Sequence, residues 1–380
     1  MRSLIKYSAP VVVAALALSG CGTKGGDSAS SGSTSGEKKC DLQIGFFGAL
    51  TGDAANLGIN IKNGADLAVK QYNEKHKDCQ VKLKQFDSQG SETQAPALAK
   101  TAIDDKTVIG IVGPAFSGES KAADPAFNEA GLTTITPSAT NPALAKNGWK
   151  TFFRALGNDA SQGPAAAKYI KDDLKATKVF VMDDASEYGK GLADIAKSDL
   201  GPLVIGTDRI QQKQTDFSAS VTKVKASGAQ ALFYGGYYAE AGLLVKQLKD
   251  AGWKGTMVVG DGVKDDGYIK AGGAAAEGTI MTCPCLPPDK APEFQSAFKA
   301  AYNSDPATYS AEGYDAANVF LDGIAAGKST RDDMLAYVKS YDKQGVTKKM
   351  KFDATGEPAD ISVWAYKVQD GKIVPVKEIK

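Results

Sequence analysis

The sequence predicts an α/β protein built from parallel sheets in two lobes, and three observations support this. Short apolar runs alternate along the chain with stretches of helical periodicity, the order that places helices on parallel sheets. Glycine-rich turns follow several of the apolar runs. Residues 40–380 also exceed what one compact hydrophobic core usually holds, which favours two lobes.

The expected strands are short apolar or alternating runs. They cover residues 42–47, 81–86, 108–112, 132–136, 179–182, 203–207, 231–234 and 257–259. The first strand precedes a helical pattern with Ile61, Ala65, Ala68 and Tyr72 on one face, and residues 97–105 form another helical pattern. Glycine-bearing loops follow the strands at 48–52, 113–118, 235–236 and 260–262. Since ligands of open α/β sheets bind beyond the carboxyl ends of the strands, these loops are the expected binding region.

The N-terminus has the pattern of a secretion signal over residues 1–20. Basic residues precede an apolar run at 9–18 that is too short to span a bilayer. The segment 18–21, Leu-Ser-Gly-Cys, resembles a bacterial lipobox, which implies that Cys21 becomes the N-terminus and carries lipid. The expected location is extracytoplasmic, lipid-anchored to the cell membrane through Cys21. An ordinary secretory signal with a chance cysteine is the alternative.

A flexible tether is expected over residues 21–39. Beyond Cys21 this stretch is almost entirely glycine, serine, threonine and charged residues. Such a composition buries too little apolar surface to fold by itself. The folded part therefore begins at Cys40.

Four cysteines follow Cys21, in a compartment that permits disulfides. Cys40 opens the first strand pattern and Cys79 opens the second. Adjacent parallel strands begin side by side, so the geometry allows a bridge between these two residues. Cys283 and Cys285, separated by one proline, are either a tight bridge or two thiols. A zinc site would need a second cysteine or histidine pair, which the sequence lacks.

The sequence carries no recognisable catalytic machinery or cofactor motif, so we expect a binding protein without a cofactor or metal. His76, the only histidine, lies at a polar helix end, where it does not suit a Ser-His-Asp triad. Residues 323–329 are one residue short of a phosphate-binding loop and are typical of a helix end. Gly45, Gly48 and Gly52 do not fit the dinucleotide fingerprint. Basic and acidic residues nearly balance, 45 to 44, so nothing indicates nucleic acid as a partner.

Nine segments together resemble the branched-chain amino-acid (Leu/Ile/Val) binding proteins of ABC importers, over nearly the whole mature chain. They lie at residues 48–52, 63–68, 111–114, 136–142, 159–164, 188–192, 215–218, 234–240 and 260–262. The resemblance implies a type I periplasmic-binding-protein fold: two doubly wound parallel-sheet lobes joined by a three-segment hinge, with ligand in the cleft. The chain crossings fall near Gly157, Pro284 and Glu357.

The same resemblance implies the lobe boundaries. Lobe one would comprise residues 40–157 plus 286–356, and lobe two residues 158–285 plus 357–380. A free amino acid is a zwitterion, so the cleft between the lobes must satisfy both a carboxylate and an ammonium group away from water.

The resemblance assigns the contacts of lobe one. Ser117 matches a position whose hydroxyl and backbone N–H bind the ligand carboxylate, just before a helix pattern whose N-terminus favours an anion. Thr140, with the backbone of Ser138 and Ala139, matches the second contact loop for the carboxylate and ammonium. Taken singly, each residue also fits a simple cap or turn role.

The resemblance also assigns the contacts of lobe two. Asp261 matches the acidic position that binds the ammonium group, where better-known leucine-binding members have glutamate; its other interpretation is a turn residue facing water. Tyr188 and Tyr237 match aromatic positions that cap the cleft, and Tyr309 is a further candidate wall. Leu57 stands where leucine-binding members often have an aromatic residue, so the ligand's side chain is not settled by the sequence.

The expected function is capture of a free amino acid, by default leucine, isoleucine or valine, and its delivery to ABC permease subunits by hinge closure. The resemblance also implies a monomer and no enzyme activity. A sensory amino-acid or amide-binding module of the same fold is the alternative.

Overall fold

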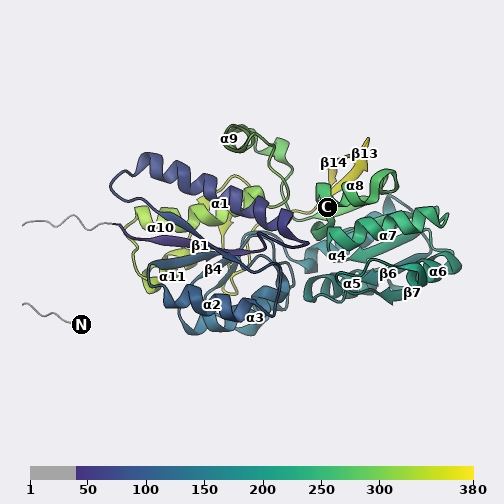
Figure 1. The fold of residues 1–380 in the computed structure, drawn as a ribbon, viewed down its shortest axis with the longest axis horizontal. Helices are drawn as coiled ribbons and strands as arrows, with labels where there is room; N and C mark the ends of the chain where they lie inside the picture. Colours follow the sequence, from purple (N-terminus) through teal and green to yellow (C-terminus); the bar gives the residue numbers. More distant parts are fainter. Residues whose placement is uncertain (1–39) are drawn as a thin grey trace, which may run out of the picture. The chain divides into compact units, whose positions relative to one another are not determined.

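The computed structural model describes residues 40–380, which belong to one compact unit containing two main β-sheets with helices on both faces of each (Figure 1). The predictions for the signal at 1–20, the tether at 21–39 and the lipid on Cys21 lie outside the described residues. The predicted α/β class is confirmed.

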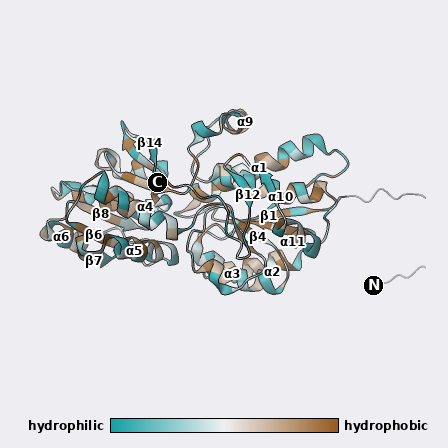
Figure 2. Cartoon of the chain, turned by 180° about the vertical axis from the view of Figure 1, so that it is seen from behind, coloured by the Kyte–Doolittle hydropathy of each residue, from teal (hydrophilic) through white to brown (hydrophobic). Residues whose placement is uncertain are grey.

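The first sheet is wholly parallel, in the order β2-β1-β3-β4-β5. Its strands are β1 (Gln43–Gly48), β2 (Lys82–Asp87), β3 (Val108–Val112), β4 (Thr134–Thr136) and β5 (Phe152–Arg154). Helices α1 (Ala55–Lys75), α10 (Ser310–Ala325) and α11 (Arg331–Lys339) pack on one face. Helices α2 (Ala95–Asp104) and α3 (Ser117–Glu129) pack on the other. The central strands are predominantly hydrophobic because both faces are covered (Figure 2).

The second sheet has the order β14-β13-β10-β9-β8-β6-β7. Its parallel strands are β6 (Val179–Asp183), β7 (Val204–Arg209), β8 (Ala231–Gly235), β9 (Thr256–Val259) and β10 (Ile280–Cys283). Helices α4 (Asp159–Asp172) and α5 (Glu187–Leu200) cover one face. Helices α6 (Ser218–Ser227), α7 (Tyr238–Asp250) and α8 (Asp266–Gly272) cover the other.

Two antiparallel strands at the edge of this sheet were not expected from the sequence patterns. They are β13 (Trp364–Gln369), which pairs with β10, and β14 (Lys372–Glu378), which pairs with β13. Asp370 and Gly371 join them, both with positive φ, at 52° and 68°. This is the backbone that a two-residue hairpin turn with an Asp-Gly sequence adopts. The second sheet is therefore mixed rather than purely parallel.

Smaller elements complete the structure. The ribbon of β11 (Asp342–Gln344) and β12 (Lys349–Lys351) is antiparallel. Helix α9 (Pro292–Tyr302) packs through Phe294 and Phe298 against Leu67 of α1.

The chain passes between the two sheets three times: between β5 and α4, between β10 and α9, and between β12 and β13. These passages lie close together. A Cβ atom placed on Gly157, in the first passage, would lie 2.7 Å from Ile361 in the third and 3.2 Å from Pro284 in the second. The predicted division falls within the passages. We retain it as a proposed division and call 40–157 plus 286–356 lobe one, and 158–285 plus 357–380 lobe two.

Two sequence interpretations that argued against an enzyme are confirmed. Helix α10 ends at Ala325 and Gly327 follows with a φ of 79°, so the 323–329 segment is a helix end rather than a phosphate-binding loop. His76 directly follows the last residue of α1 and stacks on Tyr72 with ring centroids 4.2 Å apart.

Candidate functional site

A small cavity lies between the two lobes, beyond the carboxyl ends of the strands. It has about 10 Å³ of free volume, room for about one water molecule, so the side chains of the two lobes close tightly around it. Five of the seven predicted ligand residues line it, whereas Ala139 and Thr140 do not. The lining residues are Leu57, Ala115, Phe116, Ser117, Ser138, Tyr188, Tyr237, Asp261, Gly262 and Tyr309.

Lobe one contributes Ser117, the first residue of α3, to this cavity. Its hydroxyl accepts a hydrogen bond from the Asn141 N–H at 3.3 Å. The preceding loop is held by Glu119, whose carboxylate accepts the Phe116 N–H at 3.3 Å and a hydrogen bond from the Ser88 hydroxyl. Burial raises the pKa of Glu119 to about 8. These hydrogen bonds of Glu119 hold the loop before α3 in place. The N–H groups at the start of α3 are therefore in a fixed position, where they can bind an anionic group.

The loop after β4 contributes Ser138, while its next residues turn away from the cavity. The Ser138 hydroxyl donates to the Ala115 carbonyl at 2.6 Å, which ties this loop to the one before α3. The Ala139 carbonyl accepts a hydrogen bond from the buried Arg154 guanidinium, and the Ala139 N–H donates to Thr136 at 2.9 Å. The Thr140 hydroxyl is buried and has no hydrogen-bond partner among residues 40–380. Of the three residues in this loop, Thr140 alone keeps an unused side-chain polar group.

Asp261 directly follows β9 in lobe two and is completely buried. One carboxylate oxygen accepts the Tyr188 hydroxyl at 2.6 Å, and the other accepts the Tyr309 hydroxyl. Burial is the largest cause of change in the pKa of the Asp261 carboxyl, and it raises that pKa. Tyr188 lies in lobe two and Tyr309 in lobe one, so this carboxylate joins the lobes at the cavity wall.

Tyr309 has the left-handed backbone conformation, with φ at 69°, immediately before α10. A bulky residue with positive φ is uncommon and is found where the surrounding structure imposes it. Here this backbone brings the phenol to Asp261. The sequence alone suggested only a loose wall position, because neither the backbone conformation nor the hydrogen bond has a local signal.

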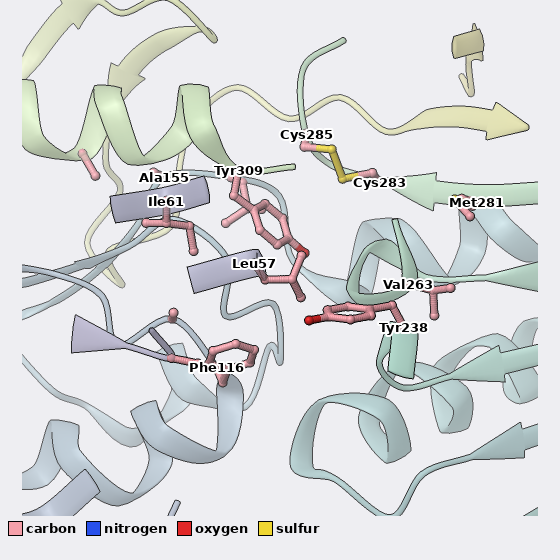
Figure 3. Packing of buried hydrophobic residues seen from close by; sticks show 14 of the residues in the cluster. Leu57, Ile61, Phe116, Ala155, Tyr238, Val263, Met281, Cys283, Cys285 and Tyr309 are labelled. Carbon is pink, nitrogen blue, oxygen red and sulfur yellow. A yellow bond between two sulfur atoms is a disulfide. The ribbon is translucent and has the colours of Figure 1, made fainter. Parts of the chain in front are cut away.

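An apolar wall completes the cavity. The Tyr237 ring contacts Phe116 edge-on at 5.4 Å between centroids and lies 5.2 Å from the Tyr188 ring. Leu57, from the first turn of α1, and Phe116, just before α3, contribute from lobe one, and Figure 3 shows Leu57 beside Tyr309. This combination of aromatic and aliphatic surface matches an apolar ligand side chain.

Polar pairs between the lobes flank the cavity. Lys121 in lobe one forms an ion pair with Glu187 in lobe two at 2.9 Å, and the Asn141 amide donates to the Glu187 carbonyl at 3.0 Å. On another side, the Asn56 amide donates to Asp265 at 2.8 Å. The lobes are therefore in contact around the cavity, as in a closed arrangement.

The four described cysteines lie in two pairs. The sulfur atoms of Cys40 and Cys79 are 2.00 Å apart, and those of Cys283 and Cys285, at the second passage between the lobes, are 1.97 Å apart (Figure 3). No cluster of histidine, cysteine, aspartate or glutamate that could hold a metal ion is found within residues 40–380. Over the same residues, no helix combines the length and apolar character needed to cross a membrane.

A family model described as periplasmic binding protein matches residues 41–372 of the sequence. The chain belongs to the periplasmic binding protein family. This agrees with the resemblance drawn from the loop segments.

Named relatives in this family include amino-acid binders. The sequence is 34% identical to Leu/Ile/Val-binding protein homolog 3 of Brucella melitensis, over 88% of this chain and 93% of that protein. It is 30% identical to the leucine-, isoleucine-, valine-, threonine- and alanine-binding protein of Pseudomonas aeruginosa, over 86% of this chain and 89% of that one.

Solved structures of this family have the same fold. The branched-chain amino acid transporter substrate-binding protein LivJ from Streptococcus pneumoniae, in complex with isoleucine, matches with a TM-score of 0.82 and 28% identity. The match covers 88% of this chain and 99% of that one. The leucine-binding protein LivK from Thermotoga maritima matches with a TM-score of 0.81 and 27% identity, over 89% and 99% of the two chains.

Proposed function

We propose that this protein is an extracytoplasmic solute-binding protein of an ABC importer, which captures leucine, isoleucine or valine between its lobes. The observation that carries the proposal is the composition of the cavity. A buried carboxylate, a serine at a helix N-terminus and an aromatic and aliphatic wall line one small cavity. Relatives named for binding these amino acids, over most of both chains, support it.

Each end of the ligand would have its own partners. Ser117 and the N–H groups at the start of α3 would bind the carboxylate, with the backbone of Ser138 and Ala139 beside them. The Thr140 hydroxyl would form a hydrogen bond with the carboxylate or the ammonium group of the ligand. Asp261 would accept from the ammonium group.

The ligand side chain would lie against the apolar wall of Leu57, Phe116, Tyr188 and Tyr237, with the two tyrosines capping the cleft. Binding would begin on one lobe and end with hinge closure, which excludes water and strengthens the polar contacts inside. Delivery would follow when the closed form docks on the permease subunits.

The same proposal includes the processing of the N-terminus, the disulfides and the oligomeric state of the protein. Residues 1–20 would be a signal that is removed, and Cys21 would carry the lipid anchor. Disulfides would join Cys40 to Cys79 and Cys283 to Cys285 in the oxidising compartment. The protein would act as a monomer.

Isothermal titration calorimetry on residues 40–380, freed of ligand by unfolding and refolding, tests the proposal against a panel of amino acids. We expect tight binding of leucine, isoleucine or valine. Asp261→Asn should weaken that binding at least tenfold, since a hydrogen bond to a charged group contributes about 1.5–3 kcal/mol. The exposed Asp266 lies five residues later, so Asp266→Asn is the matched control and should bind like the wild type. No heat with any amino acid from folded protein would refute the proposal.

A further inference from the structure

Two consecutive residues of lobe one, Thr308 and Tyr309, contact the same turn of lobe two. Tyr309 donates to Asp261, as described above. The Lys264 ammonium donates to the Thr308 hydroxyl at 3.2 Å, and that hydroxyl donates in turn to the Lys264 carbonyl. The Lys264 N–H donates to the Asp261 carbonyl at 3.0 Å, so these two residues belong to one turn after β9. The lobes are therefore joined at two adjacent points, and the residue assignments above use only one of them.

The lobe-one side of these contacts is a short turn before α10. The Ser310 N–H donates to the Ala307 carbonyl at 3.1 Å, and the Ala307 N–H donates to the Ser310 hydroxyl at 3.2 Å. Thr308 and Tyr309 lie between these two residues. Because the turn is closed by its own hydrogen bonds, the position of Thr308 also determines the position of Tyr309.

Lys264 is a costly residue at this place. It is 7% exposed and its partner Thr308 is 3% exposed. Burial lowers the pKa of the Lys264 ammonium to about 8, and the charge of Glu312 offsets part of this effect. No carboxylate within residues 40–380 forms an ion pair with the ammonium, which lies over the Tyr366 ring, 4.3 Å from its centroid. A methionine of similar length would fill the same space without burying a charge, so the lysine points to a use for its polar group.

The contact between Lys264 and Thr308 depends on the lobes being together. Lys264 lines a groove of about 820 Å³ that is bordered by α8 of lobe two and by α9 of lobe one. Separation of the lobes would take the Thr308 hydroxyl away from the ammonium, which water in this groove would then hydrate. The hydrogen bonds of this pair therefore belong to the closed arrangement.

We propose that Lys264 is a positioning residue for ligand capture, whose contact with Thr308 forms as the lobes close and holds Tyr309 against Asp261. The inference rests on the proposed amino-acid binding and adds to it a second contact between the lobes. Neither Lys264 nor Thr308 lines the cavity, so both act through their neighbours. Because the contact forms after the ligand has entered, its loss speeds the release of the ligand and leaves its entry unchanged.

Thr308→Val removes the hydroxyl and keeps the shape of the side chain. Calorimetry should show leucine binding about tenfold weaker, the size of a hydrogen bond to a charged group. Stopped-flow fluorescence should show leucine release about tenfold faster and an association rate within about twofold of the wild type. Thr308→Ser, which keeps the hydroxyl, should restore most of the affinity and the slow release. A merely structural role would lower the stability of the protein without this difference between the two rates.

Lys264→Met tests the other half of the contact. It removes the ammonium but keeps the backbone carbonyl that accepts from Thr308, so leucine binding should weaken about three- to tenfold. The double variant Lys264→Met, Thr308→Val should bind no more weakly than Thr308→Val alone, since both changes remove the same contact. Lys270→Met is the matched control, because Lys270 is an exposed lysine of α8 that lines the same groove. It should bind and release leucine like the wild type.

Amine labelling of the wild-type protein tests the inference without a substitution. Acetic anhydride modifies accessible lysine amines, and mass spectrometry locates the modified residues. Lys264 should be modified faster without leucine than at saturating leucine, because closure buries its ammonium against Thr308. The exposed Lys270 should be modified at the same rate in both conditions.

The outcomes separate this inference from the proposed function. The wild-type Kd and release rate in either folded variant, Thr308→Val or Lys264→Met, would overturn the inference alone. Modification of Lys264 at a rate that bound leucine does not change would do the same, even if both variants failed to fold. Absence of binding of any amino acid by the folded wild type would overturn the proposed function and this inference with it.

Discussion

The hydrogen bond from the Tyr309 hydroxyl to the Asp261 carboxylate crosses from lobe one to lobe two at the cavity wall. Tyr309→Phe removes this donor and leaves the ring in place. We expect leucine binding to weaken about tenfold, because a hydrogen bond to a charged group contributes about 1.5–3 kcal/mol and this one also holds the lobes together. Calorimetric titration with leucine measures the change.

A second tyrosine–aspartate pair supplies the control for this prediction. The Tyr302 hydroxyl donates to Asp66 at 2.8 Å, between two helices of lobe one and away from the cavity. Tyr302→Phe should keep the wild-type Kd. If Tyr309→Phe also kept the wild-type Kd, the Tyr309 hydroxyl would not contribute to binding, and the residue would serve only to pack its ring at the cavity wall.

At the residue scale, the sequence best predicted which residues line the cavity where those residues lie within a motif. Ser117, Asp261 and Tyr188 lie in glycine-bearing loops or helix starts next to strands, and the structure brings all three to the cavity. Tyr309 was only a loose candidate, because neither its positive-φ backbone nor its hydrogen bond to Asp261 has a local sequence signal.

At the scale of elements, the eight expected strands all occur, and β3 (Val108–Val112) has the predicted bounds. Strands β5 and β10 were missed because runs of three and four residues show no clear period, whereas the equally short β4 lies within the longer run 132–136. Strands β13 and β14 were missed although the Asp370–Gly371 turn has a local signal. The place of β13 in the sheet depends on its pairing with β10, which lies some eighty positions away in the chain.

The two cysteine pairs should stabilise the protein by different amounts, since they close loops of different length. Cys40 and Cys79 are 39 residues apart, whereas Cys283 and Cys285 are two apart. In the chain-entropy account a loop of that longer size contributes about 4 kcal/mol. We therefore expect replacement of Cys40 and Cys79 by alanine to lower the free energy of unfolding by several kcal/mol, and replacement of Cys283 and Cys285 to lower it much less.

Urea unfolding of both double variants and the wild type checks this contrast. A thiol assay on the unfolded wild-type protein first establishes that both pairs are oxidised. Equal destabilisation by the two replacements would show that loop length is not the deciding quantity here.

At the scale of the molecule, the lobes hold each other through contacts that the ligand does not touch. Glu187 of lobe two accepts from Lys121 at 2.9 Å and from the Asn141 amide at 3.2 Å, both in lobe one. Such contacts favour the closed arrangement, and the apparent affinity for a ligand depends on the fraction of protein able to close. Affinity can therefore change without any change in the cavity.

Glu187→Gln should accordingly weaken leucine binding about two- to fivefold, since exposed ion pairs contribute about 0.2–1 kcal/mol. The effect should shrink at high salt, because exposed charges are screened. Asp194→Asn is the control on the same helix, since Asp194 pairs with Lys190 of its own lobe and spans no cleft. Calorimetry at low and high salt, together with small-angle scattering of the ligand-free proteins, tests both points. If Glu187→Gln opened the ligand-free protein but left the Kd unchanged, closure would not limit binding, and affinity would be set by the cavity contacts alone.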